Sequence, residues 1–310
     1  MQILRSIPEL AQIPGPVFLA IGVFDGVHLG HQAVISTAAR HAAEAGGTAV
    51  VVTFDPHPAK ILRPEKSPRL LTATPHKISL IRGLGVSHLL VLRFDRELAS
   101  TLPENFVRQL VESARPLREI CVGQEWSFGK NRAGNLALLK KLGAELGFNV
   151  VGVEPVTSQE KIISSTAIRQ AVETGDFAAA RRMLGRDYTI LGTVEEGKHL
   201  GRSLGFPTAN LSAHSEQFPP NGVYAAEGLL NGKTVRGVVN LGVRPTVDDG
   251  SLQRVLEFHL FDFDRDLYGE DVELRFLQYL RSEQKFENLA GLREQIARDV
   301  EAARSIFANR

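Results

Sequence analysis

Two histidines, His28 and His31, occupy the end of a glycine-rich segment that reads GVFDGVHLGH (22–31). The segment follows an apolar run, Val17–Ile21, so the pattern predicts a buried strand, a tight turn and then a helix. The first turn of a helix has unpaired backbone N–H groups and a partial positive charge, which attract anions such as phosphates. Residues three apart share one helix face, so both imidazoles can converge on one phosphate.

Two other interpretations of the histidine pair are open at this point. Histidines at this spacing can bind zinc, but a zinc site needs further ligands and Cys121 is the one cysteine of the chain. The histidines can also be ordinary surface residues. The glycines at positions 22, 26 and 30 favour a ligand instead, because glycine permits a close approach to the backbone. We therefore interpret the segment as a phosphate site.

A second candidate phosphate site is the segment ISSTAIR (163–169), which opens a predicted helix. Its hydroxyl groups can simply cap the helix, because Ser and Thr side chains bond the free N–H groups there. That interpretation leaves Arg169 unexplained, since a cation in the first turn opposes the helix dipole. A bound polyphosphate would reverse the sign of this interaction, so we favour phosphate binding.

The composition is that of an ordinary soluble globular protein, with 310 residues, 43% hydrophobic and 23% charged. A net charge of +1 gives no reason to expect nucleic acid as a partner. No apolar stretch approaches the about 20 residues of a membrane helix, and the N-terminus lacks the apolar core of a secretory signal. A single cysteine fits a reducing compartment. We expect a cytoplasmic protein without membrane association, and the sequence names no protein partner.

The first half of the chain alternates strand-like and helix-like segments, which predicts a parallel sheet covered by helices. Ligands of such sheets bind beyond the carboxyl ends of the strands, where the histidine segment lies. The predicted strands are Val17–Ile21, Thr48–Phe54, His88–Leu92, Ile120–Val122 and Asn149–Val153. The predicted helices are Gln32–Ala45, Lys77–Gly83, Glu104–Ser113 and Leu136–Leu146.

The pattern changes after about Gly185, where successive strands are separated by turn residues. Asn231-Gly232 is a strong signal for a two-residue hairpin. We expect an antiparallel sheet or small barrel that closes with a helix over 289–307, and domains of 1–185 and 186–310. The predicted strands are Tyr188–Val194, Gly222–Leu230, Thr234–Leu241, Val255–Phe263 and Asp271–Phe276.

Four motifs of the first half occur in a characteristic order. The strand followed by HxGH resembles the signature of the nucleotidylyltransferase superfamily, and ISSTxIR resembles its second signature. With TFDPHP (53–58) and VGQEWSFGKNRAGN (122–135), the set resembles the FAD synthetase module of the bacterial bifunctional riboflavin kinase/FMN adenylyltransferase family. One departure is Glu125-Trp126, where the family usually has Asp-Phe.

This resemblance implies a Rossmann-like α/β domain in which the FMN phosphate attacks the α-phosphate of ATP, giving FAD and pyrophosphate. No protein nucleophile is needed, so catalysis would be positioning and charge stabilisation by His28 and His31. Mg²⁺ is expected on the triphosphate. The residues expected to bind ATP and its phosphates are Gly22, Phe24, Asp25, Gly30, Ser164, Ser165, Thr166 and Arg169. Those expected to bind the flavin are Asp55, His57, Trp126, Phe128 and Asn135.

The second half has two polar elements that could do chemistry. GRSLGFPTANL (201–211) is a glycine-rich turn entering a strand, and such loops are often only structural. Thr208 and Asn210 supply neutral oxygens two apart, which suit a hard cation shared with phosphates if the segment is extended. Glu257 alternates with Leu and Phe in a predicted strand, and a solvated strand face is the ordinary explanation for such a carboxylate.

These elements, with NLGVRPT (240–246) and LEFHLFDFDRDLYG (256–269), resemble the riboflavin kinase module of the same family. The resemblance implies that Thr208 and Asn210 bind Mg²⁺ with the nucleotide, beside Gly201 and Gly205. It also implies that Glu257 activates the 5′-hydroxyl of riboflavin, a poor nucleophile that needs a carboxylate within hydrogen-bond reach.

We therefore expect a bifunctional enzyme that uses ATP to convert riboflavin to FMN and then FMN to FAD. The alternative is an HxGH nucleotidylyltransferase for another phosphorylated substrate, with the barrel as a binding module. An RNA-binding barrel would show a basic face with stacking aromatics, whereas here the aromatics of 257–266 are mixed with acids.

Overall fold

The chain folds into two compact units in a computed structural model, which describes residues 1–196, 206–214, 217–245, 252–263, 265 and 267–309. The first unit comprises 1–168 with 182–185, and the second comprises 169–181 with 186–310. The domain limits that we predict, 1–185 and 186–310, stay a proposal. Before residue 185 the structure divides the chain differently, because residues 169–181 group with the second unit and residues 182–185 with the first.

The first unit contains a six-stranded sheet in which every pair of neighbours is parallel. This confirms the predicted α/β class. The chain builds outward from β2 to β3 and β4, then returns to place β5 on the other side of β2, so the sheet has a topological switch point between β2 and β5. In spatial order the strands are β1 (Gln2–Leu4), β4 (His88–Arg93), β3 (Thr48–Asp55), β2 (Val17–Ile21), β5 (Leu117–Gly123) and β6 (Asn149–Val153).

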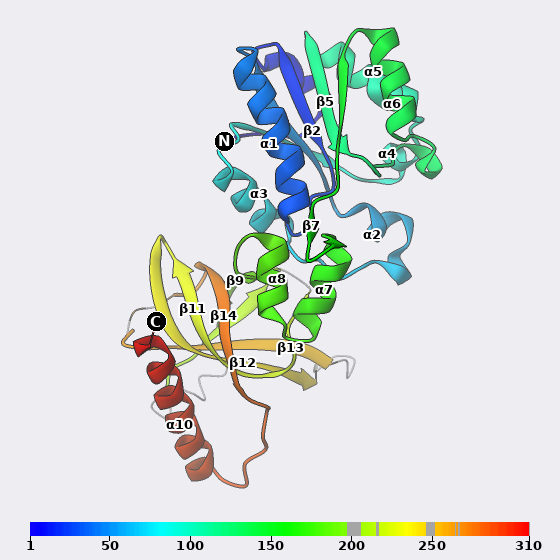
Figure 1. Ribbon diagram of the computed structural model, residues 1–310. Helices are drawn as coiled ribbons and strands as arrows, with labels where there is room; N and C mark the ends of the chain where they lie inside the picture. Colours follow the sequence, from blue (N-terminus) through cyan, green and yellow to red (C-terminus); the bar gives the residue numbers. More distant parts are fainter. Residues whose placement is uncertain (197–205, 215–216, 246–251, 264, 266, 310) are drawn as a thin grey trace. The chain divides into compact units, whose positions relative to one another are not determined.

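Helices cover both faces of this sheet (Figure 1). On one face, α1 (Leu29–Glu44) and α3 (Thr74–Gly83) pack on alternate strand residues such as Ala20 and Val51. On the other, α5 (Pro103–Ser113) and α6 (Leu136–Leu146) pack on the intervening residues. Each strand is apolar on both sides for this reason. The remaining elements are η1 (Ile7–Gln12), α2 (Pro58–Leu62), η2 (Pro64–Lys66), α4 (Arg96–Ser100), η3 (Lys130–Arg132), β7 (Thr157–Ser158), β8 (Lys161–Ile162), α7 (Ser165–Glu173) and α8 (Phe177–Leu184).

The second unit contains a closed antiparallel barrel, as the sequence predicts. Its hydrophobic interior includes Phe258 and Leu274, which are fully buried. The terminal helix α10 (Leu289–Ala308) follows the barrel and packs Ala303 and Phe307 against it. Around the barrel the strands are β10 (Ala209–Ala213), β13 (Leu252–Leu260), β12 (Lys233–Pro245), β11 (Gly222–Leu230), β14 (Asp271–Arg281) and β9 (Thr189–Glu195).

Turn geometry sets the limits of two barrel strands. Asn231 and Gly232 both have positive φ, 49° and 77°, and they join β11 to β12 as the two-residue hairpin that the sequence predicts. The predicted strand 255–263 is wrong at its end: β13 stops at Leu260, because the chain turns at Asp262, where φ is 53°.

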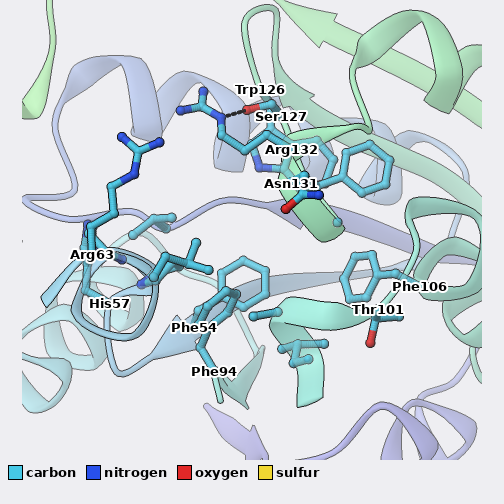
Figure 2. A pocket seen from close by; sticks show the side chains of 18 of the residues that line it. Phe54, His57, Arg63, Phe94, Thr101, Phe106, Trp126, Ser127, Asn131 and Arg132 are labelled. Carbon is cyan, nitrogen blue, oxygen red and sulfur yellow. Dashed lines mark hydrogen bonds between the residues drawn. The ribbon is translucent and has the colours of Figure 1, made fainter. Parts of the chain in front are cut away.

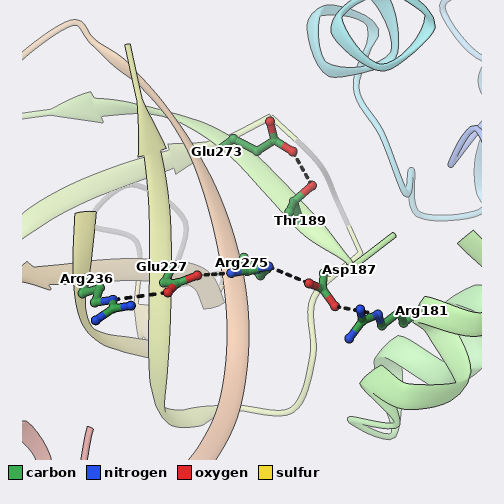
Figure 3. Close-up of polar contacts among 7 residues, drawn as sticks. All are labelled: Arg181, Asp187, Thr189, Glu227, Arg236, Glu273 and Arg275. Atoms are coloured by element: carbon green, nitrogen blue, oxygen red, sulfur yellow. Dashed lines mark hydrogen bonds and ion pairs between the residues drawn. The ribbon is translucent and has the colours of Figure 1, made fainter. Parts of the chain in front are cut away.

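A chain of charges links Arg181, the last residue of the segment 169–181, to the barrel strands. Arg181 on α8 pairs with Asp187 at 3.5 Å, and Asp187 pairs with Arg275 of β14 at 2.7 Å. Arg275 in turn contacts the buried Glu227 of β11, which also pairs with Arg236 (Figure 3). Because each carboxylate lies between two guanidinium groups, α8 is joined to the barrel wall by alternating charges.

Replacing Phe258 with alanine should destabilise the barrel by about 3–5 kcal/mol, because the ring is 0% exposed and its removal leaves a cavity. The matched control is Leu229→Ala on β11, where the side chain is 46% exposed and the cost should stay below about 1 kcal/mol. Urea unfolding followed by circular dichroism measures both. Equal costs for the two variants would contradict the described barrel interior.

Candidate functional site

The turn between β2 and α1 has an unusual backbone. Phe24 and Val27 have positive φ values of 52° and 42°, and Gly26 between them has φ of 86°. A non-glycine residue in the left-handed region is uncommon, and for a β-branched valine it is strained. The turn therefore needs support from the surrounding structure to keep this conformation.

Asp25 supplies part of that support. Its buried carboxylate accepts hydrogen bonds from the backbone N–H groups of Leu71 at 3.3 Å and Thr72 at 3.0 Å. The Thr72 hydroxyl in turn accepts a hydrogen bond from the N–H of Gly26 at 3.0 Å. The Asp25 side chain thus fastens the turn to residues 71–72, and its predicted contact with ATP stays a prediction.

His28 and His31 lie together at the start of α1. His28 is the N-cap residue, and its Nδ1 accepts the backbone N–H of His31 at 3.3 Å. The two rings are stacked with centroids 3.5 Å apart and planes inclined by 21°. His28 is buried, and so is Nδ1 of His31, which has no hydrogen-bond partner among the described residues. These are not ordinary surface histidines.

Burial lowers the pKa of His31 well below its usual range, and the charges of His28 and Lys77 lower it further. The ring is therefore neutral near pH 7, when it can donate one hydrogen bond and accept another. An arriving phosphate would favour the protonated form, since an anion offsets the desolvation of the cation.

The glycines at 22 and 30 serve packing inside the turn. A Cβ atom at position 22 would lie 2.6 Å from the Phe24 ring, and one at position 30 would lie 3.1 Å from Cε1 of His28. Glycine is required at position 22 by the protein's own packing. The approach of ATP to these two residues and to Phe24 stays a prediction.

The start of α7 lies directly against this turn. Ser165 Oγ donates a hydrogen bond to the carbonyl oxygen of Asp25 at 2.9 Å. Ser164 Oγ accepts the N–H of Ala167 at 3.2 Å, so the capping interpretation holds for this hydroxyl. Thr166 is exposed, and Arg169 belongs to the second unit. The structure thus places the first residues of the ISSTxIR segment beside the histidine turn.

A cavity of about 790 Å³ opens beyond the strand ends at the switch point (Figure 2). Its aromatic residues come from the end of β3, from the segments that follow β4 and β5, and from α5. Trp126 and Phe128 are stacked on each other, with centroids 4.4 Å apart and planes at 11°. Val23 of the histidine-bearing turn also lines the cavity. The aromatic residues are Phe54, Phe94, Phe106, Trp126 and Phe128.

Polar groups stand among these rings. His57, Arg63 and Arg132 line the cavity, and Nε of Arg132 donates to Ser127 Oγ at 2.7 Å. Aromatic walls with cationic groups suit a planar ring system that carries a phosphate. Arg63 follows the short helix α2, and no periodic signal in the sequence marks it as a site residue.

Two residues that the resemblance assigns to the flavin do not line the cavity. Asp55 lies at the end of β3 and accepts a hydrogen bond from the Thr74 hydroxyl at 2.6 Å. Asn135 is the N-cap of α6, and its side chain accepts the N–H of Leu138 at 2.9 Å. Three of the five assigned residues, His57, Trp126 and Phe128, do line it.

In the second unit, three polar residues form a row across adjacent strands. Asn210 of β10 pairs with Glu257 of β13, and Glu257 pairs with Asn240 of β12. Paired residues point to the same face of a sheet, so the three side chains share one face. The neighbouring row of Leu211, Leu256 and Leu241 is buried, which assigns the polar row to the outer face of the barrel.

His259 connects this row to the PTAN segment (207–210). Its Nδ1 donates to the carbonyl oxygen of Pro207 at 2.8 Å, and its ring contacts Phe206 edge-on at 5.4 Å. Burial lowers the pKa of His259, so the ring is neutral and this N–H is its single donor. Thr208 is exposed just before β10, while Gly201 and Gly205 lie outside the described residues.

Three residues of types that can bind a metal lie close together on α1 and β5. Among the described residues, the structure groups His41, Glu119 and Cys121, whose ligand atoms lie within 4.8 Å of one another. His41 pairs with Glu119 at 2.6 Å, and the buried thiol of Cys121 donates to the same carboxylate at 3.2 Å. These contacts satisfy the group internally. His28 and His31 are not part of this group.

Two further residues lie at these sites without having been singled out from the sequence. Asn240 belongs to the polar row, and its place there depends on strand register. Lys77 of α3 is buried, and its Nζ donates to the carbonyl oxygen of Val23 at 2.9 Å. A spacing of four from the buried Ile81 was the available signal, because it assigns Lys77 to the buried helix face.

Comparisons with known proteins agree with the two-unit architecture. Residues 10–167 match the FAD synthetase family model, and residues 184–307 match the riboflavin kinase family model. The chain is 37% identical over 309 residues to the bifunctional riboflavin kinase/FMN adenylyltransferase of Escherichia coli (strain K12), covering 99% of this chain and 98% of that protein. It is 38% identical over 295 residues to the protein of the same name from Bacillus subtilis (strain 168), covering 94% and 92%.

A solved structure from Streptococcus pneumoniae has a TM-score of 0.80 and 28% identity, covering 98% of each chain. Its title names a macrolide-efflux protein. In the described part of the present chain, no helix is long and apolar enough to cross a membrane.

The motifs occur in the expected order, the two units match both family models, and full-length relatives in several bacteria carry the combined name. The chain therefore belongs to the bifunctional riboflavin kinase/FMN adenylyltransferase family.

Proposed function

We propose that the first unit adenylylates FMN in the aromatic cavity and that the second unit phosphorylates riboflavin along the polar row. The observation that supports the first assignment is the meeting of cavity and turn: Val23 lines the cavity and lies in the same turn that presents His28 and His31. An isoalloxazine ring among the aromatic walls would place its phosphate next to a phosphate-binding helix start.

In adenylylation, an oxygen of the FMN phosphate attacks the α-phosphorus of ATP. The bond from this phosphorus to the bridging oxygen breaks, and pyrophosphate leaves with the electron pair. His28 and His31 donate hydrogen bonds to the phosphate oxygens as negative charge builds up. The start of α7, with Ser164, Ser165 and Thr166, binds the leaving phosphates together with Arg169.

In phosphorylation, the 5′-hydroxyl oxygen of riboflavin attacks the γ-phosphorus of ATP and ADP leaves. Glu257 accepts the hydroxyl proton as general base, which the row geometry supports because Asn210 and Asn240 flank it on both neighbouring strands. His259 holds Pro207, and through it the PTAN segment, at the edge of this row.

Mg²⁺ is the proposed cofactor of the kinase site. Thr208 and Asn210 offer neutral oxygens, which are hard donors; Thr208 is exposed just before β10 and Asn210 is half-buried within it, which supports room for phosphate oxygens and water. When bound there, Mg²⁺ neutralises charge on the transferring phosphates. Asn210 and Thr208 would hold it, while Gly201 and Gly205 would lie against the nucleotide.

Two variants should separate the activities. His31→Ala removes a phosphate donor and should lower FAD formation from FMN by about 10²-fold or more, with riboflavin phosphorylation intact. Glu257→Gln removes the general base and should lower FMN formation by about 10²–10⁴-fold, while FAD still forms from supplied FMN. Chromatography of the flavin products, with riboflavin or FMN supplied with ATP and Mg²⁺, measures both.

The wild-type chain, assayed beside these variants, distinguishes the alternative family activity. A wild type that uses ATP with another phosphorylated substrate but not with FMN would support a different HxGH transferase. Loss of both activities in either variant would contradict the assignment of one activity to each unit.

The cavity assignment predicts an effect on FMN binding. Trp126→Ala removes one of the two stacked rings and should raise the KM for FMN roughly 10-fold, with a smaller change in the KM for ATP. Tyr268→Ala serves as the control, because this ring is exposed and belongs to the second unit. An unchanged KM for FMN in the Trp126 variant would remove the cavity as the flavin site.

The metal assignment predicts a selective change in Mg²⁺ dependence. Asn210→Ala removes one proposed ligand, so riboflavin phosphorylation should need a higher Mg²⁺ concentration for half its maximal rate. The Mg²⁺ dependence of FAD formation from FMN is the internal control and should not move. Parallel shifts in both reactions would show that Asn210 does not act through the kinase metal.

A further inference from the structure

Lys77 is a buried lysine next to the proposed adenylylation site, and neither the motifs nor the mechanism above assign it a role there. It lies on α3 and is only 3% exposed. Lysine is almost never buried to this extent without compensating partners, because removing an ammonium from water is strongly unfavourable. Such a residue needs a specific explanation.

The partners of Lys77 identify what it holds. Nζ donates to the carbonyl oxygen of Val23 at 2.9 Å and to the hydroxyl of Thr53 at 3.5 Å. The Thr53 hydroxyl donates to the same carbonyl oxygen at 3.0 Å. Three elements therefore meet at one backbone oxygen: the turn after β2, the strand β3 and the helix α3.

This carbonyl belongs to the residue that precedes the strained part of the turn. Phe24 and Val27 keep left-handed conformations that are unfavourable for non-glycine residues, and these persist only where the surroundings hold them. Asp25 is held by the backbone of residues 71 and 72. Lys77 supplies the second buried, charged anchor, two residues before Asp25 at the Val23 carbonyl.

The charge of Lys77 also acts on the site. It lowers the pKa of His31, together with burial and the charge of His28. Burial lowers the pKa of Lys77 itself, while Asp25 and Asp55 oppose that shift and favour the ammonium form. The charge of Lys77 thus interacts with both carboxylates and with the imidazole of His31.

We propose that Lys77 is a positioning residue for adenylyl transfer: its ammonium holds the Val23 carbonyl and thereby sets the turn that presents His28 and His31. The inference rests on the proposed adenylylation of FMN by the first unit. Lys77 does not need to touch ATP for this role, because a small displacement of the histidines is enough to slow a reaction that depends on alignment.

The test compares three variants of the full-length chain. Lys77→Met keeps the length of the side chain and removes the charge and the donor, whereas Lys77→Arg keeps both. Lys140→Met is the matched control, because Lys140 is an exposed lysine on α6. FAD formation from FMN gives kcat and KM, riboflavin phosphorylation reports on the second unit, and a thermal melt reports on folding.

Lys77→Met should lower kcat for FAD formation about 10²-fold with a small change in the KM for FMN, while riboflavin phosphorylation is retained. Lys77→Arg should recover part of this loss, and Lys140→Met should equal wild type. Histidine ring resonances followed by NMR against pH should show a higher His31 pKa in Lys77→Met than in Lys77→Arg, because a neighbouring positive charge is lost. A purely structural role would not move this pKa selectively.

Wild-type kcat in Lys77→Met, or an unchanged His31 pKa, would overturn the proposal. A parallel fall of both activities and of the melting temperature would also overturn it, since Lys77 would then serve folding. Should Lys77→Met fail to fold, Lys77→Gln, which keeps a donor without the charge, gives the same comparison. If wild type makes no FAD from FMN, the proposed function fails instead, and the His31 titration still decides whether Lys77 acts on this histidine.

Discussion

The first unit depends on one local constraint, the left-handed turn that carries the chain from β2 into α1. Phe24 and Val27 adopt backbone conformations that their side chains disfavour. Two buried charged residues hold the turn in place: Asp25 accepts the backbone N–H of Thr72, and Lys77 donates to the carbonyl oxygen of Val23. The topology places this turn at the switch point of the sheet, beside the loop that follows β5. The turn presents His28 and His31, contributes Val23 to the aromatic cavity and contacts Ser165 at the start of α7. These parts of the site lie together because they adjoin the same strand ends.

In the second unit, strand register rather than a strained turn aligns the residues of the proposed site. A residue on the outer face of a barrel is aligned with its neighbours by the ladder, so Asn210, Glu257 and Asn240 form one row without any special backbone conformation. His259, two positions along the same strand as Glu257, lies on the same outer face and binds the Pro207 carbonyl. The strand that carries the proposed base thus also holds the segment that carries the proposed metal ligands.

Local patterns predicted most of the architecture. The limits of β2, β6, β11 and α6 agree with the structure to the residue, because continuous apolar runs and helical periodicity are properties of consecutive residues. Short elements such as β1, α2 and the β7–β8 hairpin were missed, since two to five residues are too few to show a period. The flavin assignment of Asp55 and Asn135 stays a prediction: Asp55 bonds Thr74, Asn135 bonds Leu138, and neither residue lines the cavity.

By itself, the sequence determined the family, the two-unit organisation and the presence of a histidine pair at a helix start. Each of these follows from short motifs and local patterns of neighbouring residues. Only the tertiary structure decided which distant residues support that pair. Lys77 meets the Val23 carbonyl across 54 positions, and Ser165 meets the carbonyl of Asp25 across 140. Such contacts follow from how helices and strands pack on a sheet, and no spacing along one chain encodes them.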